Sequence, residues 1–152
     1  SFSKTYNMTG WRMGWACGNP QLIKALAKVK SNFDSGVFQA IQVAGVTALR
    51  TEEADLDDLR RMYEERRDTF INGLRAIGWK ITPPKAAFYV WAKIPKGFSD
   101  SMETSKAFLE KANIVATPGV GFGKAGEGYI RMTLTVGKER LNEAVQRLSK
   151  IL

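Results

Sequence analysis

The first fourteen residues read Ser1-Phe2-Ser3-Lys4-Thr5-Tyr6-Asn7-Met8-Thr9-Gly10-Trp11-Arg12-Met13-Gly14. Lys4 lies three residues after Ser1 and next to Ser3, and Arg12 follows eight residues later between two glycines. This layout suits a phosphate-bearing aldehyde, because an amine can attack the aldehyde while hydroxyls and a guanidinium hold the phosphate. Lys4 would need a lowered pKa, which a nearby cation such as Arg12 and partial burial can provide.

Two other interpretations of this stretch stay open on spacing alone. One is a basic surface loop. The other follows from Ser-x-x-Lys, the spacing of penicillin-binding serine nucleophiles, although no Ser-Asp-Asn or Lys-Thr-Gly element follows. A strand end carrying Lys4 and a strand carrying Arg12 would let both side chains face one pocket. A reactive lysine this early leads us to expect the C-terminal portion of a larger enzyme.

The bulk composition excludes several classes of function. The chain has 152 residues, 44% of them hydrophobic, which is enough for one compact domain. It has no histidine and one cysteine, which excludes histidine-based catalysis, histidine metal sites and an internal disulfide; we expect no metal. The net charge of +8 permits anion binding, but the charges are spread along the chain, so we expect no nucleic-acid partner. No apolar run reaches the roughly 20 residues that span a membrane, and we expect a cytoplasmic protein.

Strand and helix patterns alternate along the chain, which predicts an α/β or α+β fold. Helices are expected from 20 to a break at 34–36, and over 37–50, 52–77, 101–112 and 138–152. Strands are expected over 11–18, 79–82, 87–94, 114–117 and 129–136. The strand over 11–18 should bury Cys17. The charge-rich start of the long helix divides the chain into domains 1–53 and 54–152.

A second group of residues lies near the C-terminal end. Glycines recur from Pro118 to Gly128 and allow a tight backbone, but no Gly-Lys-Ser/Thr closes them into a phosphate loop. Arg131 then lies inside an apolar strand, where a cation is unfavourable without a partner. It could hold a substrate carboxylate through two hydrogen bonds, or form a structural ion pair with an acidic residue of the protein.

Together these elements resemble the class I/II aminotransferases, which are fold-type I pyridoxal-phosphate enzymes. Ser1-Phe2-Ser3-Lys4 with Gly10-x-Arg12-x-Gly14 resembles their lysine signature. The resemblance continues in order through Asn19-Pro20, Ser35-Gly36-Val37-Phe38-Gln39, Phe88-Tyr89-Val90-Trp91, Pro118-Gly119, Phe122-Gly123 and Tyr129-Ile130-Arg131. Residues 6–12 and 32–42 look most like the LL-diaminopimelate aminotransferases. The stretch 83–88 departs from the commoner Pro-x-Gly form.

The resemblance implies a role for each candidate residue. Lys4 would be the Schiff-base lysine and the proton carrier. Ser1 and Arg12 would bind the cofactor phosphate, and Ser3 would border the lysine and contribute less directly. Arg131 would bind the substrate α-carboxylate. Residues 1–53 would end the large cofactor-binding domain, and 54–152 would form the small C-terminal domain.

The implied function is transfer of an amino group between an amino acid and a 2-oxo acid, by a homodimer that uses pyridoxal 5'-phosphate. A lyase or decarboxylase of the same fold is an alternative, since the cofactor serves all of these reactions. A catalytically inactive isolated domain is another. In this family the pyridine-nitrogen aspartate and the ring-oxygen tyrosine precede the lysine, so we expect the 152 residues alone to be inactive.

Overall fold

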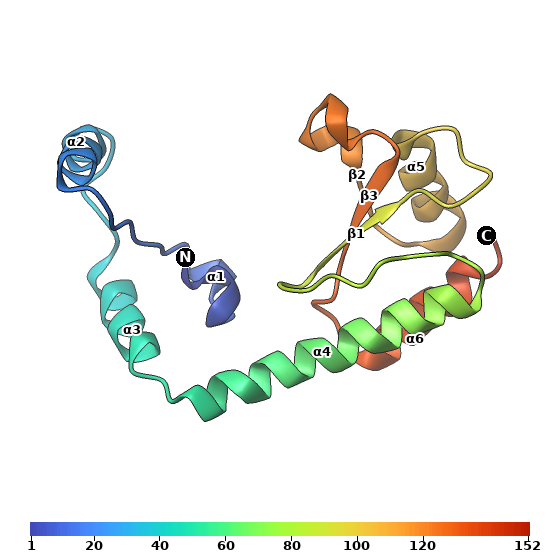
Figure 1. The fold of residues 1–152 in the computed structure, drawn as a ribbon, viewed down its shortest axis with the longest axis horizontal. Helices are drawn as coiled ribbons and strands as arrows, with labels where there is room; N and C mark the ends of the chain where they lie inside the picture. The colour runs from blue at the N-terminus through green and yellow to red at the C-terminus, as the bar shows by residue number, and fades with distance from the viewer. The chain divides into compact units, whose positions relative to one another are not determined.

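The computed structural model describes all 152 residues and divides into two compact units, Ser1–Asp58 and Leu59–Leu152. The boundary falls inside the long helix α4 (Glu53–Ala76), which Figure 1 shows in green. Each unit has its own apolar core, and each is described here by itself. None of the helices combines the length and the apolar character needed to cross a membrane.

The first unit is helical. It contains α1 (Phe2–Thr5), the 3-10 turn η1 (Thr9–Trp11), α2 (Pro20–Lys30) and α3 (Gln39–Leu49), followed by the first residues of α4. The Asn19 side chain accepts from the N–H groups of Gln21 at 2.9 Å and Leu22 at 3.4 Å, and Pro20 begins α2. This is the capping that Asn-Pro predicts. The helices expected from 20 and over 37–50 are therefore confirmed.

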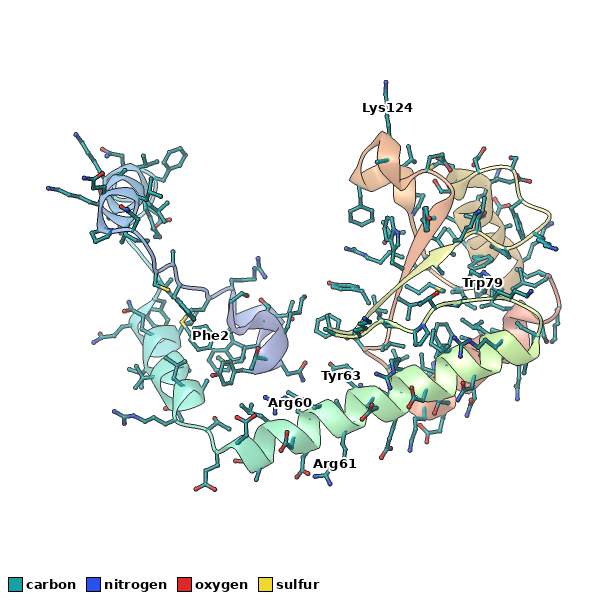
Figure 2. All side chains as sticks on the ribbon, in the orientation of Figure 1. Phe2, Arg60, Arg61, Tyr63, Trp79 and Lys124 are labelled. Atoms are coloured by element: carbon teal, nitrogen blue, oxygen red, sulfur yellow. The ribbon has the colours of Figure 1, made fainter.

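The core of the first unit joins α1 to α3. Phe2, labelled in Figure 2, is only 3% exposed and packs with Met8, Met13 and Ala48. Partly buried side chains surround these four, namely Tyr6, Val37, Ile41 and Ala44. The segment that carries Lys4 is thus anchored to the unit by the apolar residue two positions before the lysine.

The strand expected over 11–18 is wrong. Thr9–Trp11 forms a 3-10 turn, residues 13–17 have no regular secondary structure, and Cys17 is exposed. The reason is that a strand needs a ladder partner, and the first unit contains no other strand. For the same reason Lys4 does not end a strand: it lies in the short helix α1.

The second unit packs a small sheet against helices. Its strands are β1 (Tyr89–Lys93), β2 (Thr117–Pro118) and β3 (Tyr129–Thr133), in the order β1-β3-β2 with both pairs antiparallel. The remaining elements are α5 (Ser101–Ala112), the 3-10 turns η2 (Gly119–Phe122) and η3 (Lys124–Gly126), and α6 (Lys138–Leu148). Mixed helix and antiparallel sheet confirms the expected fold class.

One face of this sheet forms the core. Val90, Ala92, Ile130 and Met132 alternate along β1 and β3, are all buried, and pack with apolar residues of α4, α5 and α6. The intervening residues of the two strands lie on the other face, as the period of two requires. These residues are Tyr89, Trp91, Lys93, Tyr129, Arg131 and Thr133.

The strand expected over 79–82 is also wrong, although Trp79 and Ile81 are both 5% exposed and point into the core. Their backbone has no ladder partner. Side chains provide the polar contacts instead: the Trp79 indole N–H donates to the Lys93 carbonyl at 3.0 Å, and the Arg75 guanidinium donates to the Ile81 carbonyl at 2.8 Å. Figure 2 labels Trp79 above the end of α4. Here the alternation of buried residues reflects packing rather than pairing.

Candidate functional site

The structure brings the lysine segment next to the arginine segment. The backbone N–H of Phe2 donates to the carbonyl oxygen of Met13 at 3.3 Å. A Cβ added to Gly14 would lie 3.7 Å from the Cα of Ser1, so the segments that contain Ser1 and Gly14 are in contact. Ser1, Ser3 and Lys4 on one side and Arg12 on the other therefore belong to one local cluster, which we call the N-terminal cluster.

Thr9 links the two halves of this cluster. Its hydroxyl donates to the Ser3 carbonyl oxygen at 2.9 Å, and its own carbonyl oxygen accepts from Nη1 of Arg12 at 3.0 Å. Sequence reasoning did not single out Thr9. Nothing in the sequence distinguishes it from the other hydroxyl residues of the turn, because its role depends on how the turn folds.

The backbone at Arg12 is left-handed, with φ 53° and ψ 42°. Residues other than glycine adopt this conformation rarely, and such positions cluster at functional sites. The Arg12 side chain is exposed, and its bond to Thr9 uses one of the five N–H donors of a guanidinium. The remaining donors are available to an anion at this position.

Lys4 lies on the exposed side of α1, while Phe2 occupies the buried side. The Ser1 side-chain oxygen caps α1 by accepting from the N–H of Ser3 at 3.2 Å, which leaves the hydroxyl proton of Ser1 to donate elsewhere. A primary amine, a guanidinium and hydroxyl donors thus share one exposed segment. This donor set fits a phosphate-bearing aldehyde.

Arg131 belongs to the second unit and lies on the central strand β3, opposite Trp91 of β1 and Thr117 of β2. Its guanidinium carbon lies 4.5 Å from the ring centroid of Tyr89 and 4.4 Å from that of Phe122. The Nε atom is buried and has no hydrogen-bond partner. Arg131 forms no ion pair in this chain, so the structural ion pair considered from the sequence is absent.

The glycine-rich segment after β2 positions Phe122. A Cβ on Gly119 would lie far inside van der Waals contact with the carbonyl oxygen of Gly126, and a Cβ on Gly126 would clash equally with Gly119. Only glycines allow η2 and η3 to approach this closely. The close approach that the sequence predicts is therefore present, and it forms two 3-10 turns.

Glu127 ties this segment to the start of α5. Its carboxylate accepts from the N–H of Ser101 at 2.7 Å, from the Ser101 hydroxyl at 3.0 Å and from the N–H of Gly128 at 2.7 Å. The bond from the Gly128 N–H, followed by the bond from the Ser101 N–H, lowers the pKa of Glu127 below its ordinary value of 4.5. Sequence reasoning missed this residue, because Ser101 and Glu127 are distant in the chain.

The comparisons with known proteins show the family of the chain. The family described as Aminotransferase class I and II matches residues 1–148, and the chain belongs to this family. The family uses pyridoxal phosphate, so the family, fold and cofactor predictions are confirmed.

Two relatives share about half of the sequence. The LL-diaminopimelate aminotransferase of Moorella thermoacetica is 52% identical over 152 residues, which are 100% of this chain and 39% of the relative. The LL-diaminopimelate aminotransferase of Syntrophobacter fumaroxidans is 54% identical over 151 residues, 99% of this chain and 39% of the relative. The solved structure of apo BacF from Bacillus subtilis superposes with a TM-score of 0.92 at 40% identity, over 99% of this chain and 39% of that chain. The chain thus spans about two fifths of the length of these proteins.

Proposed function

We propose that this protein is a pyridoxal-phosphate-dependent aminotransferase that transfers an amino group between an amino acid and a 2-oxo acid. The observation that carries the proposal is the contact between the segments of Phe2 and Met13, which gathers an amine and a guanidinium on one exposed surface. Membership of the aminotransferase family gives these groups their chemical context.

Each residue of the N-terminal cluster has a distinct task in this proposal. When bound, the cofactor supplies an electron sink for the bonds at the substrate Cα. Lys4 holds the cofactor through its amine and moves the proton at that carbon. Arg12 and the hydroxyl of Ser1 bind the phosphate, and Ser3 supports them from α1, the helix that also carries Lys4. Arg131 binds the substrate α-carboxylate, and its planar fork matches that group.

We assign residues 1–53 to the large cofactor-binding domain and residues 54–152 to the small domain. We also propose a cytoplasmic homodimer. Apolar side chains left exposed on the first unit support the existence of further contacts there, since a large apolar surface marks an interaction site. These side chains are Leu22, Leu26, Val29, Phe33, Val43 and Val46.

LL-diaminopimelate is the first substrate to test, because the two relatives named above carry that activity in their names. The experiment is a half-reaction: the full-length gene product, loaded with pyridoxal phosphate, is mixed with one amino acid at a time. Conversion of the cofactor to its amine form, with release of the 2-oxo acid, supports the proposal. Release of carbon dioxide or of an eliminated group, with the aldehyde form retained, would favour a decarboxylase or a lyase.

A further inference from the structure

We infer that Phe122 and Tyr89 are positioning residues for Arg131, and that they fix the plane of its guanidinium so that its outer edge meets a carboxylate. This inference rests on the proposed function, in which Arg131 binds the substrate carboxylate. It adds two aromatic residues to the candidate site that touch the arginine and not the reacting atoms.

The two rings reach Arg131 from different elements. Tyr89 comes from β1 and lies diagonally across from Arg131, because the residue directly opposite is Trp91. Phe122 comes from η2, the turn that follows the other neighbouring strand. The centroid distances of 4.5 and 4.4 Å are within the range of cation–π attraction. Arg131 on the central strand β3 thus contacts one ring from the β1 side of the sheet and one from the β2 side.

Further rings hold these two in place. Phe122 makes an edge contact with Trp91 at 5.5 Å, and Trp91 stacks on Tyr129 at 5.7 Å with 15° between the planes. On the other side, Tyr89 contacts Phe88 at 4.9 Å. Aromatic side chains that pack in this way have little rotamer freedom. The arginine therefore needs less ordering when a ligand binds, which is how preorganisation raises affinity.

The buried Nε of Arg131, which has no hydrogen-bond partner, distinguishes Arg131 from an arginine that only stabilises the fold. An arginine that only stabilises a fold pairs its fork with an acid or a carbonyl, whereas Arg131 forms no such bond in the chain. Nε is buried, while the two Nη atoms are not among the buried unpaired atoms. The rings cover the inner part of the guanidinium and leave its outer edge for two parallel bonds to a carboxylate.

The first test measures whether ring removal affects carboxylate binding selectively. In the full-length gene product, propionate and propionamide are compared as competitive inhibitors; they are similar in size and differ in charge. Phe122→Leu and Tyr89→Leu should each weaken propionate by roughly 3- to 30-fold and leave propionamide within about twofold, as loss of a cation–π contact predicts. The KM for the amino acid should rise in parallel, with a smaller change in kcat. Phe122→Tyr, which keeps a ring, should restore propionate binding.

Equal weakening of both inhibitors, or no weakening of propionate, would overturn the inference. Arg131→Gln, which removes the positive charge, distinguishes its failure from that of the proposed role of Arg131. If Arg131→Gln abolishes the preference for propionate and the ring variants keep it, only the positioning role is wrong. If Arg131→Gln also keeps the preference, Arg131 is not the carboxylate-binding residue, and its proposed role fails together with the positioning role.

A second test does not depend on activity. With 15N-labelled arginine, the Nε–H signal of Arg131 is identified by its absence in Arg131→Lys. We expect it to be shifted upfield by the neighbouring rings and to exchange slowly, because Nε is buried. Phe122→Leu should move it towards the other arginines. Phe98→Leu serves as the matched control, since Phe98 contacts Phe108 in the same unit and should leave the signal in place. An Arg131 Nε–H signal that does not move in Phe122→Leu would contradict the positioning role of Phe122.

Discussion

The backbone N–H of Phe2 donates to the carbonyl oxygen of Met13, and the side chains of both residues are buried in the same core. This relationship holds Lys4 and Arg12 in one place without any contact between their own side chains being required. The reactive groups can therefore stay exposed while apolar neighbours in the same short segment fix the backbone. The core of the first unit therefore fixes the backbone positions of the residues in the N-terminal cluster.

Phe2→Ala should destabilise the first unit and release the segment that carries Lys4. Truncating a buried phenylalanine lowers the free energy of unfolding by about 3–5 kcal/mol. Amide hydrogen exchange of residues 2–13 in the full-length gene product would report the loss. Val115→Ala is the control, because Val115 is 83% exposed and lies outside the surface proposed for further contacts, so its truncation should change stability by less than about 0.5 kcal/mol. Similar exchange in the two variants would contradict the anchoring role of Phe2.

Gly119→Ala should destabilise the second unit by at least about 2 kcal/mol, because the new Cβ overlaps the carbonyl oxygen of Gly126 and the backbone must shift. Gly121→Ala is the matched control in the same turn: nothing lies within 4 Å of its added Cβ. Denaturant unfolding of both variants measures the difference. Equal stability would mean that η2 and η3 are not packed as closely as described.

The local signals in the sequence predicted helix positions well. Asn19-Pro20 marks the start of α2, and Gly78, with φ 90°, follows the end of α4 as its C-terminal cap predicts. These features depend on residues that are neighbours in the chain. The strands expected over 11–18 and 79–82 are wrong. Apolar residues in these segments indicate which side chains are buried, whereas strand formation also needs a second strand that is distant in the sequence.

In the candidate site, too, features set by neighbouring residues could be predicted and contacts between distant residues could not. Lys4, Arg12 and Arg131 can be picked out by their chemistry and spacing, and their individual roles stay predictions. Tyr89 and Phe122 could not be assigned to Arg131 in advance, because their contact depends on the register that sets Trp91 opposite Arg131. Such long-range contacts appear only when the whole sheet is formed.

Ala87→Gly should stabilise the protein. Ala87 has φ 60°, a left-handed conformation that disfavours a side chain by about 1 kcal/mol relative to glycine. Ala86→Gly provides the control: its φ is not positive, so the added freedom of the unfolded chain should lower stability by about 0.5 kcal/mol. Thermal unfolding would show opposite shifts for the two variants. Destabilisation by both would show that Ala87 is not strained.

Stability of the second unit should fall as Glu127 is protonated. The N–H groups of Gly128 and Ser101 hold the pKa of Glu127 below its ordinary value of 4.5 in the folded state. Its contribution is therefore fully present above the unfolded pKa and is lost as the pH falls below about 4.5 through the lower folded pKa. Glu127→Gln should reduce the acid dependence of unfolding, measured between pH 7 and pH 3 in roughly 0.5-unit steps. An unchanged dependence would contradict the assignment.

In the proposed function, Lys4 carries the cofactor. The most direct measurement loads the full-length gene product with pyridoxal phosphate, reduces it with borohydride, digests it and maps the modified peptide by mass spectrometry. We predict that the cofactor is fixed on Lys4, that Lys4→Ala removes this label, and that turnover in Lys4→Ala is almost completely abolished. Stoichiometric label on any other lysine, with Lys4 unmodified, would contradict the assignment of Lys4 as the cofactor-binding lysine.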